Sequence, residues 1–157
     1  MSKIVSDIVD ARAYERRLPW RLLMYWQKKR GARIMPEEND IDPEELGGDW
    51  GRCFLLQSRD IFNVVDYNFT YLGAKILQDY ENTMLDAHNE FVVGPNASQL
   101  SRYFRRMLDS RVPMLDSGEL ATSQGQRVIF RQILLPLGGA SEEVSAIFGG
   151  MSFKLVA

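Results

Sequence analysis

The sequence has 157 residues, of which 45% are hydrophobic and 25% charged, a composition typical of one globular domain. Its net charge of −2 gives no general attraction to nucleic acid or anionic membranes, and no apolar run is long enough for a signal peptide or a membrane span. The single cysteine, Cys53, excludes an internal disulfide and favours a reducing compartment. We therefore expect a cytoplasmic protein that neither binds nucleic acid nor inserts into a membrane.

The first thirty residues predict two successive helices. Residues 4–16 carry one apolar helical stripe, so residues 1–16 are expected to form a helical extension. Pro19 interrupts that stripe and suits the first turn of a second helix over residues 18–30, and Gly31 suits a left-handed cap after it. The apolar face of this second helix is formed by Leu18, Leu22, Tyr25 and Trp26. Residues 17–157 are then expected to form a single domain.

A short segment rich in turn residues follows the second helix. Pro36 favours extended backbone before it, and Asp42 followed by Pro43 is typical of a helix N-terminus. Gly47-Gly48 would end that helix after about one turn. We interpret the polar and special residues from Trp26 to Pro43 as caps, stops and anchors.

Beyond Gly48 the sequence predicts strands with helices between them. Residues 53–57 form a short apolar run of strand length. Residues 64–72 alternate, which places four side chains on one face: Val65, Tyr67, Phe69 and Tyr71. Residues 74–91 are expected to form two short helices divided at Asn82-Thr83, and a longer helix is predicted over residues 96–111.

Three strands are predicted at the C-terminal end, near residues 114–122, 127–137 and 144–155. Their connections are short enough for hairpins, so the strands are expected to pair antiparallel in sequence order. In residues 129–137 (IFRQILLPL), apolar side chains occupy both odd- and even-numbered positions. Alternate residues of a strand point to opposite faces, so we predict that both faces of this strand are covered. Helices gathered over one face can leave a cavity, and we therefore expect a small apolar pocket.

Eight side chains are candidates for the wall of this pocket and for binding a ligand or cofactor: Tyr67, Phe69, Tyr71, Ile76, Leu77, Phe104, Met107 and Ile133. Aromatic rows of this kind belong more often to a core than to a binding site, so both interpretations stay open. The sequence does not indicate which cofactor, if any, would bind there.

No catalytic or metal-binding constellation is visible in the sequence. His88 is the single histidine, which excludes any site that needs two; we interpret it as an exposed or helix-end residue, with haem ligation as the alternative. Cys53 lies in an apolar run without a second cysteine, so we interpret it as a core thiol, with flavin attachment or redox sensing as alternatives. The acidic residues between Asp40 and Glu45 lack the spacing of a calcium loop.

Two further patterns also favour structural roles. The basic helix face at Arg102, Arg105, Arg106 and Arg111 lacks interleaved exposed aromatics, so we interpret it as a solvated surface. The glycine pairs at 138–139 and 149–150 do not form a nucleotide-binding loop, because neither glycine-rich fingerprint occurs.

The order of the predicted elements resembles a PAS domain preceded by an N-terminal helix. The motifs are similar to those of a bacterial family of short, stand-alone PAS proteins, over about residues 18–153. They are Trp26, the turn Arg30–Arg33 (RGAR), Pro36, the D-I-D-P sequence Asp40–Pro43, Tyr71–Gly73 and the strand Arg131–Leu137 (RQILLPL). The sequence departs from the family at Glu38, at Ala74 and over residues 78–81, the last of which lie where a PAS pocket is lined, so no ligand is carried over.

This resemblance implies an α+β fold. The expected arrangement is a five-stranded antiparallel sheet with short helices on one face and an N-terminal helix packed on the other. The strand after Gly51 is expected to be central, with the last strand beside it.

The resemblance also implies a sensory or adaptor protein in intracellular signalling, which binds a small molecule in an apolar pocket, a partner protein, or both. The chain ends near Ala157 without an output module, so we expect the signal to leave through a partner or a change of oligomer. The stripe at Ile4, Val5 and Ile8 is the candidate homodimer surface. The alternative is a small cone-shaped α+β enzyme of the isomerase or cyclase type that uses Tyr67 or Tyr71 with Asp66.

Overall fold

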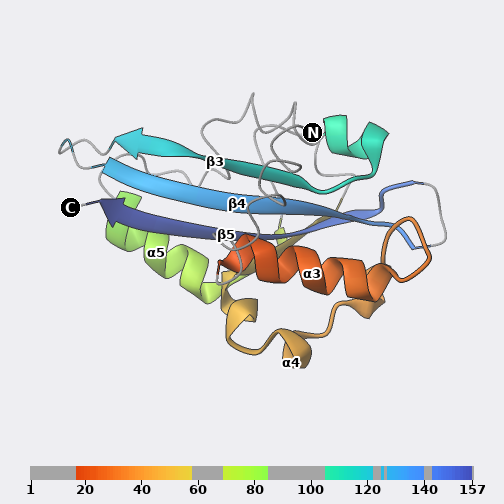
Figure 1. Ribbon diagram of the computed structural model, residues 1–157. Coiled ribbons are helices and arrows are strands. Elements are labelled where there is room, and N and C mark those ends of the chain that lie inside the picture. The colour runs from red at the N-terminus through yellow and green to blue at the C-terminus, as the bar shows by residue number, and fades with distance from the viewer. Residues whose placement is uncertain are drawn as a thin grey trace.

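The structure, a computed structural model, describes residues 17–57, 69–84, 105–121, 125, 127–139 and 143–156. Its elements are α3 (Leu18–Arg30), η1 (Glu38–Asp40), α4 (Pro43–Leu46), η2 (Gly47–Arg52), β1 (Cys53–Gln57), β2 (Phe69–Leu72), α5 (Ala74–Met84), β3 (Met114–Ala121), β4 (Arg127–Leu137) and β5 (Ala146–Val156). Residues 105–110 are also helical. The strands form one antiparallel sheet (Figure 1), so the predicted α+β architecture is confirmed. The extension predicted over residues 1–16 lies outside the described residues.

Helix α3 forms where the sequence predicts it because both of its ends are specified. Pro19 stands in the first turn, where its missing N–H is not needed, and Lys28–Arg30 place three cations against the negative helix end. Gly31 follows with a φ of 57°, a value that favours glycine. The face that α3 buries consists of Leu18, Pro19, Leu22, Leu23 and Trp26.

The segment after α3 is tied to the sheet and to a capped single-turn helix. The carbonyl oxygen of Pro36 accepts hydrogen bonds from the backbone N–H groups of Gly138 and Gly139, both at 2.9 Å. Asp42 caps α4 as predicted, because its Oδ1 accepts a hydrogen bond from the N–H of Glu44 at 3.0 Å. Gly47, with a φ of 55°, ends that helix.

The strand order in the sheet is β2-β1-β5-β4-β3, and each neighbouring pair is antiparallel. Both hairpins predicted for the last three strands are present. The middle strand is β5, with β1 beside it, which corrects the expectation that the strand after Gly51 would be central. The residues from Ala146 to Met151 are all buried, as a middle strand covered on both faces requires.

Two consecutive glycines in β5 let large side chains approach the sheet from opposite sides. A Cβ atom at Gly150 would overlap Cδ1 of Leu22 in α3, whereas one at Gly149 would overlap the ring of Phe54 in β1. Successive residues of a strand point to opposite faces, so Gly150 faces α3 and Gly149 faces away from it. We call these two sides the α3 face and the opposite face.

Strand register assigns the other residues to these faces. The α3 face includes Ile133, which pairs with Gly150, and Phe148, whose ring meets that of Tyr25 of α3 edge-on. The opposite face carries Phe54, Leu56, Met114, Gln132, Leu134, Asp116 and Met151. All residues from Gln132 to Leu137 are buried, on both faces of the strand, which confirms the prediction that both faces are covered.

A register shift in the outer pair of strands overturns one prediction. Tyr71 is opposite Leu55, but Phe69 is opposite Leu56, so β2 has one residue more than β1 over this stretch. Leu55 and Leu56 point to opposite faces, and so do their partners. Phe69 and Tyr71 therefore do not share a face; the bulge rotates one of them, a feature that simple alternation does not anticipate.

The helices occupy both sides of the sheet. In Figure 1, α3 lies in front of the sheet along β5, and α5 passes behind the end of β5, in line with the expectation for a PAS-like fold. Helix α3 packs against both β4 and β5. Helix α5 is continuous through Asn82 and Thr83, where a division into two helices was predicted. Of the longer helix predicted over residues 96–111, the structure describes residues 105–111, of which residues 105–110 are helical.

Candidate functional site

The opposite face of the sheet is a buried, mainly apolar surface. Phe54, Leu56, Leu134 and Met151 have at most 1% of their surface exposed, and Phe69 packs edge-on against Phe54 with ring centroids 5.7 Å apart. Buried aromatic and aliphatic side chains of this kind form the floor of most small-molecule sites. This face is therefore the candidate binding surface.

A polar pair interrupts this apolar floor. Asp116 of β3 and Gln132 of β4 are direct cross-strand partners. Among the described residues, this pair makes up the buried polar or charged side chains. Gln132 Nε2 donates a hydrogen bond to Asp116 Oδ2 at 2.9 Å. Gln132 Oε1 is buried and has no hydrogen-bond partner among the described residues. An acceptor buried without a partner costs about 1–3 kcal/mol, so the pair is expensive as core structure alone.

Neither member of this pair was singled out from the sequence. The signal was present for Gln132, a polar residue within a run (IFRQILLPL) that is otherwise apolar at the parity that faces away from α3. Asp116 lies in a segment, MLDSGELA, whose polar residues give no sign of which face is buried. Its importance follows from register, because β3 places it directly beside Gln132.

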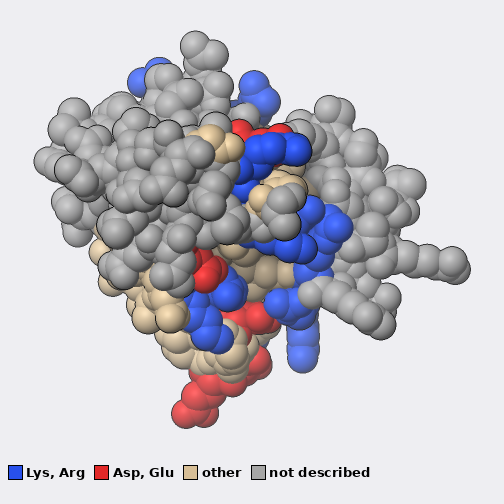
Figure 2. Space-filling model, turned by 90° about the vertical axis from the view of Figure 1, so that its left-hand side faces the viewer, with Lys and Arg blue, Asp and Glu red and all other residues tan. Residues whose placement is uncertain are grey.

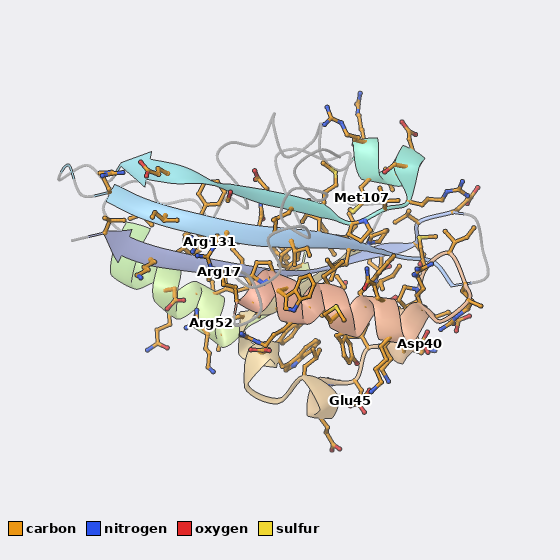
Figure 3. All side chains as sticks on the ribbon, viewed as in Figure 1. Arg17, Asp40, Glu45, Arg52, Met107 and Arg131 are labelled. Carbon is orange, nitrogen blue, oxygen red and sulfur yellow. The ribbon has the colours of Figure 1, made fainter. Side chains whose placement is uncertain are left out.

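The structure does not bring the predicted pocket residues to one surface. Ile76, Met107 and Ile133 are buried, but Leu77 is 40% exposed. Phe69 lies on the opposite face, while Tyr71 and Ile133 lie on the α3 face. Two of the eight candidates, Tyr67 and Phe104, lie outside the described residues. Figure 3 shows Met107 on the short helix above the sheet.

Tyr71 has structural partners on the α3 face. Its ring stacks on that of Trp50 with centroids 4.0 Å apart and an angle of 7° between the planes. Its hydroxyl donates a hydrogen bond to the carbonyl oxygen of Trp50 at 2.9 Å, and burial raises the pKa of this hydroxyl. This contact fixes the end of β2 against η2. Asp66, the proposed catalytic partner of Tyr71 in the alternative hypothesis, lies outside the described residues.

Comparison with known proteins agrees with this architecture. The sequence model of the PAS domain matches residues 17–152, most of the chain. The chain belongs to the PAS domain family. No curated protein matches the sequence. Membership of this family indicates a sensory or signalling role.

The segment from Trp26 to Pro43 serves to fix α3 onto this PAS domain. The indole Nε1 of Trp26 donates a buried hydrogen bond to the carbonyl oxygen of Pro136 at 2.8 Å. Asp40 Oδ2 accepts hydrogen bonds from the backbone N–H of Glu37 and from Nη2 of Arg33, both at 2.8 Å. These two donors lower the pKa of the Asp40 carboxyl. The residues of this segment thus act as caps and anchors.

Cys53 is a buried thiol on the α3 face. Its Sγ donates to the carbonyl oxygen of Asp49 at 3.2 Å, and burial raises the pKa of the thiol, so it stays protonated at neutral pH. Within the described ranges there is no cluster of three or more side chains that could hold a metal ion. No described helix is both long and apolar enough to cross a membrane.

Basic side chains form a band across the end of the molecule that lies at the left of Figure 1, as Figure 2 shows. Figure 3 labels Arg17, Arg52 and Arg131 toward this end. Acidic groups accompany the band, because Arg52 pairs with Asp79, and Arg127 pairs with Glu119 at 2.6 Å. Exposed pairs of this kind contribute little to stability, and they offset much of the positive charge of the band.

Proposed function

We propose that this PAS domain is a sensory or adaptor protein, which binds a small molecule on the opposite face of its sheet and passes the change to a partner protein. One observation carries the ligand half of this proposal. The floor contains a buried carboxylate beside a buried amide, and the amide oxygen has no partner among the described residues. A bound molecule that supplied a hydrogen-bond donor would satisfy it.

The fold supports transmission of a binding event to the rest of the molecule. The middle strand β5 has one glycine facing α3 and one facing the candidate site, each in close contact with a large side chain. A ligand that displaces Phe54 or Met151 would act on the same strand that supports Leu22. Packed cores respond to such displacements by shifting elements as units, because they are not continuously deformable.

Native mass spectrometry of the full chain, purified without added ligand, tests the ligand half. We expect a mass above that of the polypeptide, lost under denaturing conditions, since a non-covalent ligand dissociates when the floor unfolds. An absorbance scan would then distinguish a haem or flavin from a colourless compound. A chain that has its polypeptide mass under native conditions, and releases nothing on organic extraction, would contradict this half.

We further propose that the chain forms a homodimer in the cytoplasm through the apolar stripe at Ile4, Val5 and Ile8. The sequence supports this, because a stripe of this kind on a helix requires a covering surface. Light scattering on the full chain should show Ile8→Glu as a monomer and Ser6→Glu, a charge introduced between the stripe residues, as a dimer. A dimeric Ile8→Glu chain would contradict the assignment of this surface.

A further inference from the structure

We propose that Asp116 and Gln132 recognise the cationic N–H donor end of a ligand, that is, an amine or an amidine on an apolar body. This inference rests on the proposed function, since it names the class of molecule that the opposite face would take. It starts from the buried amide oxygen without a partner and from the carboxylate beside it.

The orientation of the Gln132 amide follows from hydrogen-bond chemistry. A carboxyl oxygen accepts hydrogen bonds, and the amide turns its NH₂ group toward Asp116. Gln132 Nε2 accordingly donates to Asp116 Oδ2 at 2.9 Å, which leaves Oε1 as the free end of the amide. The site therefore presents acceptors: Gln132 Oε1 and the carboxylate. A partner must bring donors.

The charge of the site further restricts the class of ligand that it would bind. Gln132 is fully buried and Asp116 is 5% exposed, and no described basic side chain forms an ion pair with Asp116. A buried carboxylate is costly unless a cation or several donors compensate it. A positively charged N–H donor satisfies both needs with one group, whereas an anion would be repelled by both acceptors.

The surroundings suit a cation attached to an apolar body. Gln132 is the cross-strand partner of Met151, and Met114 and Leu134 form the next pair on the same face. Gly118 lies beside the ring of Phe130, because a Cβ atom there would come within 2.9 Å of Cε1 of that ring. Thioether and aromatic groups are polarisable, and an aromatic ring attracts cations.

Three probes of the same shape and different charge test this class on the full chain: benzamidine (cation), benzamide (neutral) and benzoate (anion). The methyl signals of Met114 and Met151, in a chain labelled with ¹³C-methyl methionine, report occupancy of the site. We expect benzamidine to shift both signals saturably, at an affinity at least tenfold above that of benzamide, and benzoate to shift neither. Equal affinities for the three probes, or no shift with benzamidine, would overturn the inference.

Two variants test the residues themselves. Asp116→Asn keeps the shape of the pair and removes its charge, so benzamidine should lose its tenfold advantage over benzamide. Gln132→Met keeps the length of the side chain and removes the acceptor, so benzamidine affinity should fall about tenfold, as expected for one hydrogen bond to a charged group. Arg131→Met, on the α3 face of the same strand, is the matched control and should bind as the unaltered chain does.

Folding of each variant is checked by near-ultraviolet circular dichroism before titration. Benzamidine binding that survives both Asp116→Asn and Gln132→Met in folded protein would overturn the inference. The ligand proposal fails separately, when native mass spectrometry finds no bound compound. A co-purified compound that remains bound to both variants would reject the cationic class, while the proposal that the chain binds a small molecule would stand.

Discussion

The two faces of the central sheet differ in how their polar groups are satisfied. On the α3 face, the indole N–H of Trp26 donates a hydrogen bond to the carbonyl oxygen of Pro136, and the hydroxyl of Tyr71 donates one to the carbonyl oxygen of Trp50. Arg30 leaves its Nε unpaired among the described residues, but its guanidinium also donates to the carbonyl of Arg33 and lies over the ring of Trp26. On the opposite face the pair of Asp116 and Gln132 keeps an acceptor unsatisfied in the interior.

This difference separates residues that fix the fold from those available to a ligand. The α3 face is closed by contacts between elements of the chain itself, so its substitutions should change stability. The opposite face combines an apolar floor with a buried acceptor that has no partner among the described residues, so replacing both members of its polar pair together should change binding more than stability.

The largest stability loss is expected for Leu22→Ala on the α3 face. Leu22 is completely buried over Gly150, and removing its side chain leaves a cavity that should cost about 3 kcal/mol of unfolding free energy. Urea unfolding at neutral pH measures this loss. Met24→Ala on the same helix, where the side chain is 46% exposed, is the control and should cost less than about 0.5 kcal/mol. Similar losses in the two variants would contradict the assigned face of α3.

Gly149→Ala and Gly150→Ala compare the two faces at consecutive positions. At Gly149 the new methyl would lie 2.6 Å from the carbonyl oxygen of Ile133 and would overlap the ring of Phe54, so backbone must move; we expect a loss of about 2–3 kcal/mol. At Gly150 it overlaps the terminal methyl of Leu22, which can rotate away, so the loss should be smaller.

A double-mutant cycle tests whether the cost of Gly150→Ala comes from the overlap with Leu22. Gly150→Ala should cost less in the Leu22→Ala background than in the unaltered chain, because the cavity accepts the added methyl. Gly149→Ala should cost the same in both backgrounds, since Leu22 does not face it. Equal coupling of both glycines to Leu22 would show that the faces are not independent.

A smaller, pH-dependent effect is expected where the segment after α3 is anchored. The pKa of Asp40 is lowered in the folded chain by the Glu37 N–H and by Arg33, so its contribution is complete above the unfolded pKa of about 3.9 and is lost as pH falls through the folded value. Asp40→Asn should therefore cost about 1 kcal/mol at pH 7, and the difference from the unaltered chain should shrink below about pH 4. Unfolding curves between pH 7 and pH 3 measure this, with Asp109→Asn, an exposed carboxylate, as control for charge loss. A difference that is constant with pH would contradict the assignment.

Local patterns in the sequence were sufficient to predict most of the fold. Helix α3 and the cap at Asp42 follow from proline, glycine and charge positions, and β4 lies where a strand was predicted near residues 127–137. The place of β5 in the middle of the sheet and the bulge between β1 and β2 were not predicted. Both depend on pairing between distant strands, which short-range periodicity does not contain.

The candidate site was harder to predict for the same reason. The aromatic row at Phe69 and Tyr71 was conspicuous in the sequence, but the bulge sends its members to different faces. Asp116 becomes significant only beside Gln132, sixteen positions away in the sequence, where β3 and β4 are in register. Side-chain type along one strand indicated a buried surface; the chemistry of that surface depended on which residues the neighbouring strands place opposite each other.

The smallest stability change is expected for the double variant Asp116→Leu/Gln132→Met. Removing both polar partners leaves no unsatisfied group behind, and replacing a buried polar pair by apolar side chains is often neutral or stabilising, so we expect a change within about 1 kcal/mol. Gln132→Met alone should cost more, because it strands a buried carboxylate. If the double variant is as stable as the unaltered chain and no longer binds benzamidine, the pair serves recognition. A loss of several kcal/mol would instead assign the pair to the fold, and the opposite face would then resemble the α3 face.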